Sequence, residues 1–221
     1  MGAGAPREQQ APRARGFRRL TGLDRSGPLP AQTRAGQPLR PLTIPNMVGY
    51  LRLASIPVFL VLAFDSGDGR SAGAAALYFF ITAGDYLDGF LARATGQYSR
   101  LGALMDPAID RLAALAGVVV CWHFELLPRW ALVLLSVREV VTVVLAELAL
   151  RRGLDLEINW VGRLGTAAVF GGLFFSLVVE SWAVTALFLA GLALGIYATV
   201  LYGRAGRARS RAASARARPS S

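Results

Sequence analysis

Residues 85–110 read DYLDGFLARATGQYSRLGALMDPAID, and this stretch places four aspartates inside a strongly apolar chain. The aspartates are Asp85, Asp88, Asp106 and Asp110. Because the flanking sequence is apolar, we expect their carboxylates to lie at or just inside a membrane, where one ionisable side chain costs about 3 kcal/mol even on lenient insertion scales. A compensating partner is therefore expected, and a divalent cation is the simplest one.

Long apolar segments flank this stretch on both sides. The chain has 221 residues, of which 54% are hydrophobic, and its mean hydropathy is +0.44. Six segments approach the length of about 20 residues that a helix needs to cross a bilayer. They cover residues 47–64, 72–94, 101–124, 129–150, 160–179 and 182–202. Since the connections are short, we predict that residues 43–202 form one all-α domain, a six-helix polytopic membrane bundle with antiparallel neighbours.

The distribution of arginine predicts the orientation of this bundle. Arginines crowd both ends of the chain and occur at the breaks near 95–100 and 151–159, whereas the other three breaks carry more acidic residues. Six spans put both termini and the two arginine-bearing breaks on one side. We therefore predict a multi-pass protein of the cell membrane whose termini and aspartates face the cytoplasm.

The two ends of the chain, residues 1–42 and 203–221, are predicted to be disordered basic tails. A solvated tail is the simplest interpretation. Attraction to anionic lipid headgroups, worth about 1 kcal/mol per basic residue, is the alternative. We expect no nucleic-acid partner, because the tails have almost no aromatic residues on which bases could stack.

The spacing of the aspartates favours a metal site. Asp85 and Asp88 are three residues apart near the end of the second predicted helix, and Asp106 and Asp110 are four apart near the start of the third, so each pair shares a helix face. A short hairpin brings the two faces together on the cytoplasmic side. Four carboxylates suit Mg²⁺ or Mn²⁺ better than zinc, which prefers histidine or cysteine. Pro107 is compatible with this arrangement if it lies in the first turn of its helix.

The residues between the aspartates point to a diphosphate ligand. Gly89 and Gly102 would let a bulky group approach the two helix backbones closely. Arg93 can offer a forked set of donors to a phosphate, and Ser99 is a possible further donor. Together with a metal ion, these residues predict phosphoryl-type chemistry.

Written as a pattern, the stretch is D-x2-D-G-x2-A-R-x8-G-x3-D-x3-D. It resembles the signature of the CDP-alcohol phosphatidyltransferase family at every defined position. The sequence IPNMVGYLRL at 44–53 also resembles the family's entry to its first helix. The resemblance covers about residues 43–202 and leaves the tails outside.

The resemblance implies a six-helix membrane enzyme, usually a homodimer, that uses CDP-diacylglycerol as donor and needs two Mg²⁺ or Mn²⁺ ions. It implies that Asp85, Asp88 and Asp106 are metal ligands, and that Asp110 is the general base and also touches a second ion. The residues implied to hold the cytidine diphosphate part are Gly89, Arg93, Ser99 and Gly102. The hydroxyl of an acceptor would attack the phosphorus nearest the diacylglycerol, and CMP would leave.

Direct attack is favoured over a covalent route by the placement of the single cysteine and the single histidine. Cys121 and His123 lie at least eleven residues beyond Asp110 on the same predicted helix, which puts them about 16 Å away towards the opposite membrane face. Cys121 is therefore expected to be a small core residue, and His123 an interfacial one.

Ionisable residues elsewhere in the apolar segments are the candidates for binding the acceptor. We assign this role to Arg163, Arg138 and Arg52, because arginines beside the metal site would favour an acceptor that carries phosphate. The alternatives are an ion pair with a carboxylate on a neighbouring helix, or snorkelling to the membrane surface.

Resemblance to one branch of the family reduces the number of possible acceptors. GDYLDG at 84–89 and VGRLGTAAVF at 161–170 are most similar to the branch whose acceptors are glycerol phosphates. That branch includes CMP-forming cardiolipin synthases, which use phosphatidylglycerol, and phosphatidylglycerophosphate synthases, which use glycerol 3-phosphate. VGRLGT departs from the lysine-rich stretch usual in the second group, so phosphatidylglycerol is the preferred acceptor and glycerol 3-phosphate the alternative.

An ion-coupled transporter is a different interpretation of the four aspartates. Such a transporter would place carboxylates near the bilayer midplane in two related halves, but the aspartates lie on one predicted hairpin and no internal repeat is visible.

Gly191 and Gly195 in the last predicted helix allow close contact with another helix. Packing within the bundle is the preferred interpretation, and a dimer seam is the alternative.

Overall fold

The computed structural model describes residues 38–151 and 160–216, which contain six helices and no strand. The helices are α2 (Ile44–Asp65), α3 (Ala72–Thr95), α4 (Arg100–His123), α5 (Arg129–Arg151), α6 (Trp160–Ser176) and α7 (Trp182–Arg216). The all-helical prediction is confirmed. The expected boundaries agree to within three residues, except at the end of α7.

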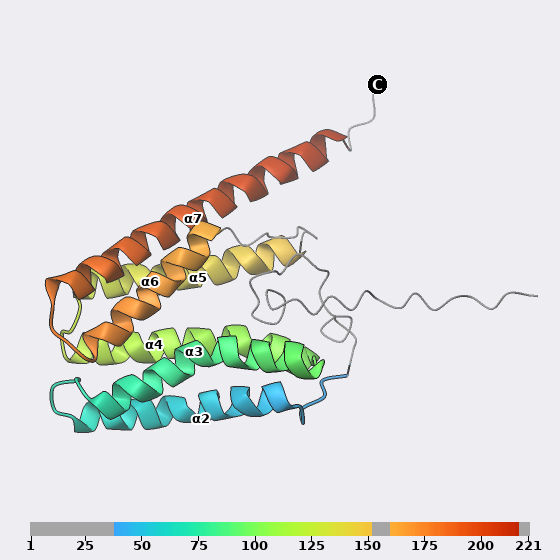
Figure 1. Cartoon of the computed structure of the whole chain (residues 1–221). Coiled ribbons are helices and arrows are strands. Elements are labelled where there is room, and N and C mark those ends of the chain that lie inside the picture. The colour runs from blue at the N-terminus through green and yellow to red at the C-terminus, as the bar shows by residue number, and fades with distance from the viewer. Residues whose placement is uncertain (1–37, 152–159, 217–221) are drawn as a thin grey trace, which may run out of the picture.

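Helix α7 continues through residues 203–216, where the sequence predicts a disordered tail. This segment is rich in alanine and arginine, which both favour helix formation and so allow the last apolar helix to run on. Figure 1 shows α7 extending past the other helices. Residues 1–37, the break at 152–159 and residues 217–221 lie outside the described part of the chain.

The turn between α3 and α4 is specified by residues at its two ends. Gly96 ends α3 in the left-handed conformation, with φ of 69°, which glycine adopts without steric cost. Ser99 caps α4, and its hydroxyl accepts a hydrogen bond from the Gly102 backbone N–H at 2.9 Å. These signals reverse the chain within four residues, and the reversal sets the two aspartate-bearing helices side by side.

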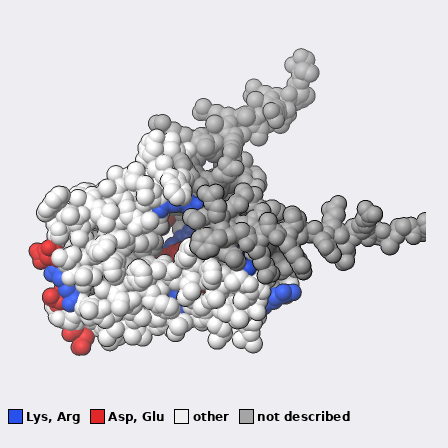
Figure 2. All heavy atoms as spheres, in the orientation of Figure 1, with Lys and Arg blue, Asp and Glu red and all other residues white. Residues whose placement is uncertain are grey.

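The helices alternate in direction (Figure 1). The connections α2–α3, α4–α5 and α6–α7 share one end of the bundle, and Arg70 pairs with Glu180 at 3.1 Å between two of them. Charged residues mark this end, while most of the visible flank between the ends carries no charge (Figure 2). The charged residues of these connections are Asp65, Asp68, Arg70, Glu125, Arg129 and Glu180. The α3–α4 turn and the ends of α5 and α7 lie at the opposite end, as the sequence predicts.

Two of the described helices are long and apolar enough to cross a membrane, judged by length and composition alone. They are Ile44–Asp65 and the Trp182–Leu201 part of α7.

The last two helices pack unusually closely through glycines. A Cβ atom on Gly165 would lie 2.8 Å from the backbone nitrogen of Gly195, and one on Gly191 would lie 2.7 Å from that of Val169. Ala198, on the same face of α7, is buried. The interpretation of Gly191 and Gly195 as packing residues within the bundle is confirmed.

The close contact predicts that Gly165→Ala lowers stability. The added methyl group meets backbone atoms that cannot rotate away, so the free energy of unfolding should fall by about 1–3 kcal/mol. Gly171→Ala on the same helix is the matched control, because its Cβ would make an ordinary contact with Leu187 at 3.7 Å. Thermal unfolding in detergent measures both. Equal melting temperatures for the two variants would contradict the packing account.

Candidate active site

The α3–α4 hairpin brings three of the four predicted metal ligands together. One carboxylate oxygen from each of Asp85, Asp88 and Asp106 lies within 4.8 Å of the other two. Asp88 is buried, whereas Asp85 and Asp106 are partly exposed. Three convergent hard oxygen donors, open on one side, fit Mg²⁺ or Mn²⁺.

Asp110 lies outside this three-oxygen cluster and is held by an arginine from another helix. Arg52 of α2 donates from Nη2 to Asp110 Oδ1 at 2.9 Å and from Nη1 to Asp88 Oδ2 at 2.7 Å. Its Nε donates to the carbonyl of Ile81 at 2.8 Å. Arg52 is fully buried. The sequence suggests Arg52 for the acceptor, but in the structure all three of its nitrogens bind residues of α3 and α4, two of them aspartates of the motif.

Gly84 makes room for this arginine and was not singled out from the sequence. A Cβ atom at Gly84 would lie 2.6 Å from Arg52 Cδ and 2.9 Å from Arg52 Nε. The only hint in the sequence was a glycine directly before the first aspartate.

Asn46 is a second residue that sequence reasoning missed. It is 2% exposed, and its Nδ2 donates to the carbonyls of Arg40 at 2.9 Å and Pro41 at 3.1 Å. Its Oδ1 accepts from Ser99 Oγ at 2.8 Å. Asn46 therefore ties the segment before α2 to the cap of α4.

The glycines assigned to nucleotide binding lie against other side chains of the protein. A Cβ atom on Gly102 would be 2.8 Å from Asn46 Oδ1, and one on Gly89 would be 3.2 Å from Arg93 Nη1. The Ser99 hydroxyl donates its hydrogen bond to Asn46 Oδ1. The predicted contacts of these four residues with cytidine diphosphate stay predictions, but Gly102 and Ser99 also have a structural reason for their identity.

Pro107 does not lie in the first helical turn, where it was expected to be harmless. Helix α4 begins at Arg100, since Ser99 caps it, so Pro107 is inside the helix. It lacks the N–H that would normally bond to the carbonyl of Ala103. The helix tolerates this loss next to Asp106.

The other two arginines assigned to the acceptor lie on later helices. Arg138 of α5 pairs with Glu139 on its own helix, and a Cβ atom on Gly195 of α7 would lie 3.2 Å from its guanidinium carbon. Its Nε is buried without a hydrogen-bond partner among the described residues. Arg163 of α6 is exposed. Figure 2 shows basic and acidic side chains together inside a recess of the visible face.

Cys121 is placed as expected, whereas the interfacial position of His123 stays a prediction. Cys121 is fully buried, with its Sγ 3.3 Å from Ser176 Oγ, which confirms it as a core residue. His123 is exposed, and its ring contacts those of Phe64 in a tilted and Phe124 in a T-shaped arrangement, at centroid distances of 4.9 and 4.7 Å.

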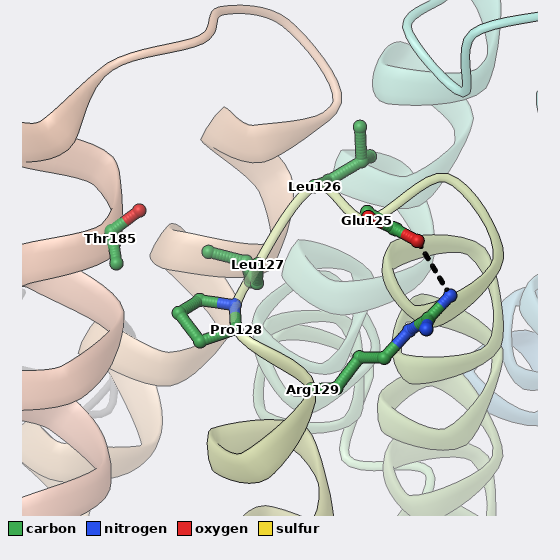
Figure 3. A pocket seen from close by; sticks show the side chains of 6 residues that line it. All are labelled: Glu125, Leu126, Leu127, Pro128, Arg129 and Thr185. Atoms are coloured by element: carbon green, nitrogen blue, oxygen red, sulfur yellow. Dashed lines mark ion pairs between the residues drawn. The ribbon is translucent and has the colours of Figure 1, made fainter.

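A separate open pocket lies at the end of the bundle that carries the α4–α5 connection (Figure 3). Its polar feature is the ion pair of Arg129 with Glu125 at 2.8 Å, and Arg129 also lies over the Trp122 ring, 5.4 Å from its centroid. The residues that line it are Glu125, Leu126, Leu127, Pro128, Arg129 and Thr185. Glu125 is the acidic residue among them and is paired with Arg129, so this pocket does not resemble the cluster of three carboxylates.

Comparison with known proteins shows which family shares this pattern. A sequence model of the CDP-alcohol phosphatidyltransferase family matches residues 42–197. The chain is 37% identical over 176 residues to the CMP-forming cardiolipin synthase of Streptomyces coelicolor, covering 76% of this chain and 80% of that protein. It is 38% identical over 133 residues to a putative cardiolipin synthase of Mycobacterium tuberculosis, covering 60% and 61%. It is 33% identical over 177 residues to the CDP-diacylglycerol–glycerol-3-phosphate 3-phosphatidyltransferase of Escherichia coli, covering 75% and 95%.

The three-oxygen cluster predicts that Asp106→Asn weakens Mn²⁺ binding by at least about tenfold, because the amide replaces a charged ligand. Electron paramagnetic resonance of free Mn²⁺, in titrations of detergent-purified protein, measures the affinity. Asp68→Asn in the exposed α2–α3 connection is the matched control and should leave it unchanged. Identical affinities for both variants would rule out Asp106 as a ligand.

Proposed function

The chain belongs to the CDP-alcohol phosphatidyltransferase family of enzymes, and from this premise we propose that it transfers the phosphatidyl group of CDP-diacylglycerol to phosphatidylglycerol, with release of CMP. The observation that carries the proposal is the convergence of Asp85, Asp88 and Asp106 beside Asp110 on one helical hairpin. This is the donor set that a diphosphate-bound cation requires.

The aspartate cluster is the proposed place of a divalent metal ion. Asp85, Asp88 and Asp106 would hold Mg²⁺ or Mn²⁺, and the resemblance implies that Asp110 also touches a second ion. When bound, the metal supplies neutralisation of the diphosphate and of the charge that develops on CMP.

The remaining groups of the hairpin are proposed to bind the donor and move the proton. Arg93, with Gly89, Ser99 and Gly102, holds the cytidine diphosphate portion. Asp110 uses one oxygen for Arg52, and its other oxygen accepts the proton of the acceptor hydroxyl. The hydroxyl oxygen forms a bond to the phosphatidyl phosphorus, the bond from that phosphorus to the CMP oxygen breaks, and CMP leaves with the electron pair.

Phosphatidylglycerol is the proposed acceptor for two reasons. Relatives at 37% and 38% identity are named cardiolipin synthase or putative cardiolipin synthase, and VGRLGT at 161–166 departs from the stretch that is usual in the glycerophosphate synthases. Arg163 and Arg138 are the proposed contacts of the acceptor phosphate. Glycerol 3-phosphate is the alternative, favoured by the 33% identity to the Escherichia coli enzyme. An ion-coupled transporter finds no support in the family match.

The proposed setting is the cell membrane, with all six helices spanning it and both termini and the aspartates on the cytoplasmic side. The observation behind this is the alternation of helix direction, which collects the acidic connections at the end opposite the α3–α4 turn (Figure 1). A homodimer is implied by the family resemblance, and the particle mass in detergent, measured by light scattering, checks it.

The acceptor is identified by supplying purified protein with CDP-diacylglycerol, Mg²⁺ or Mn²⁺, and one acceptor at a time while CMP is measured. Phosphatidylglycerol should give CMP and cardiolipin in equal amounts. CMP with glycerol 3-phosphate alone would establish the alternative acceptor. No CMP with any of phosphatidylglycerol, glycerol 3-phosphate, inositol phosphate or serine would refute the proposed reaction.

A variant in the same assay checks the assigned base. Asp110→Asn should retain binding of CDP-diacylglycerol but lose at least about 100-fold in turnover, because the amide cannot take the proton. Undiminished turnover would reject Asp110 as the base.

The orientation predicts which side of the membrane each connection faces. In a Cys121→Ser background, single cysteines at Asp68 and Gln97, both exposed, are treated on intact cells with a membrane-impermeant maleimide. The cysteine at 68 should react on intact cells, and the one at 97 only after lysis. The reverse pattern would invert the proposed topology.

A further inference from the structure

We propose that Arg52 is a positioning residue for the transfer reaction, which fixes the two carboxylates that flank it. It binds Oδ2 of Asp88 and Oδ1 of Asp110. Asp88 Oδ1 and Asp110 Oδ2 are thereby left outside the ion pair, one for the metal cluster and one for the acceptor proton. The part concerning Asp110 rests on the proposed function, whereas the part concerning Asp88 rests only on the cluster.

The complete burial of Arg52 distinguishes it from the other two arginines that the sequence suggests for the acceptor, Arg163 and Arg138. Its side chain has 0% exposure, against 5% for Asp88 and 41% for Asp110. A buried guanidinium is retained only when its donors are paired, and Nε, Nη1 and Nη2 each have a partner. Because the Arg52 side chain has no exposed surface, it is not accessible to an acceptor phosphate in this structure. Arg163, by contrast, is exposed.

The planar shape of the guanidinium allows Arg52 to bind several groups at once. Its rigid fork joins three groups on two helices: Ile81 and Asp88 on α3, and Asp110 on α4. The ammonium of lysine is a compact charge on a flexible stem and does not reproduce this planar set of donors. Charge alone is thus insufficient to hold both carboxylates in place.

Gly84 provides independent support, because its position on α3 is shaped to the arginine stem. A Cβ atom there would lie 2.6, 2.9 and 3.0 Å from Arg52 Cδ, Nε and Cγ. These atoms lie in the middle of a fully buried side chain whose three nitrogens are all hydrogen-bonded. Gly84→Ala therefore displaces the guanidinium without altering any charged group.

The test compares two charge-conserving variants, Arg52→Lys and Gly84→Ala, with the matched control Gly73→Ala. Gly73 is an exposed position on the same helix, and its Cβ would come no closer than 3.7 Å to Ser71 Oγ. Turnover, the KM for the acceptor, Mn²⁺ affinity and the melting temperature are measured for each purified protein.

We expect Arg52→Lys and Gly84→Ala to lose on the order of 100-fold in kcat, as misplaced catalytic groups do, with little change in the acceptor KM. Their Mn²⁺ affinity should fall by about 10- to 100-fold, as when a group supporting a metal ligand is lost. Gly73→Ala should match the wild type in both measurements.

Three results would overturn the proposal. A raised acceptor KM with unchanged kcat in Arg52→Lys would make Arg52 an acceptor-binding residue. A lowered melting temperature with wild-type kcat and Mn²⁺ affinity would make it structural only. Wild-type kcat and Mn²⁺ affinity in Gly84→Ala would show that the placement of the guanidinium is not needed, and this variant decides the question if Arg52→Lys does not fold. If the wild type releases no CMP, the proposed function fails, and the Mn²⁺ titrations still decide the role of Arg52 towards Asp88.

Discussion

The ion pairs of Arg52 with Asp88 and Asp110 are the interaction on which the rest of this bundle depends. Four carboxylates on one hairpin repel one another and lose hydration in apolar surroundings. The guanidinium of Arg52, on α2, neutralises part of that charge. The remaining charge is the reason why we propose a divalent cation between Asp85, Asp88 and Asp106. The same contacts join α2 to α3 and α4, so the fold and the site share one constraint.

Several features that look like ligand contacts in the sequence have intramolecular reasons in the structure. Gly102, which the sequence suggests for the nucleotide, accommodates Asn46, and Asn46 in turn is bound to the cap residue Ser99. A glycine in a signature thus marks a close approach, but the sequence does not say what approaches. Here the neighbouring groups are side chains of α2, which makes the first helix a part of the site.

The sequence predicted the helices well because apolar block length and turn residues are local signals. Gly96 and Ser99 specify the α3–α4 turn, and the spacing of the aspartates predicted their convergence on the hairpin. It did not predict the partners of Arg52, since Asp88 lies 36 residues away along the chain and Asp110 58. The apolar pattern of α2 does not reveal which face meets its neighbours. The extension of α7 differs from the predicted tail because a high arginine content is typical of disorder, whereas alanine and arginine together also favour helix.

We propose that this hairpin, held by Arg52, catalyses transfer of a phosphatidyl group directly to the acceptor hydroxyl. Cys121 is buried beside Ser176 and far along α4 from Asp110, so neither it nor its neighbour His123 is placed to form a covalent intermediate. The configuration of the product tests this proposal when sulfur replaces one non-bridging oxygen at the phosphatidyl phosphorus of CDP-diacylglycerol, which makes that phosphorus chiral. A single direct displacement predicts inversion at phosphorus. Retention, the result of two successive displacements through an enzyme-bound phosphatidyl group, would contradict the account.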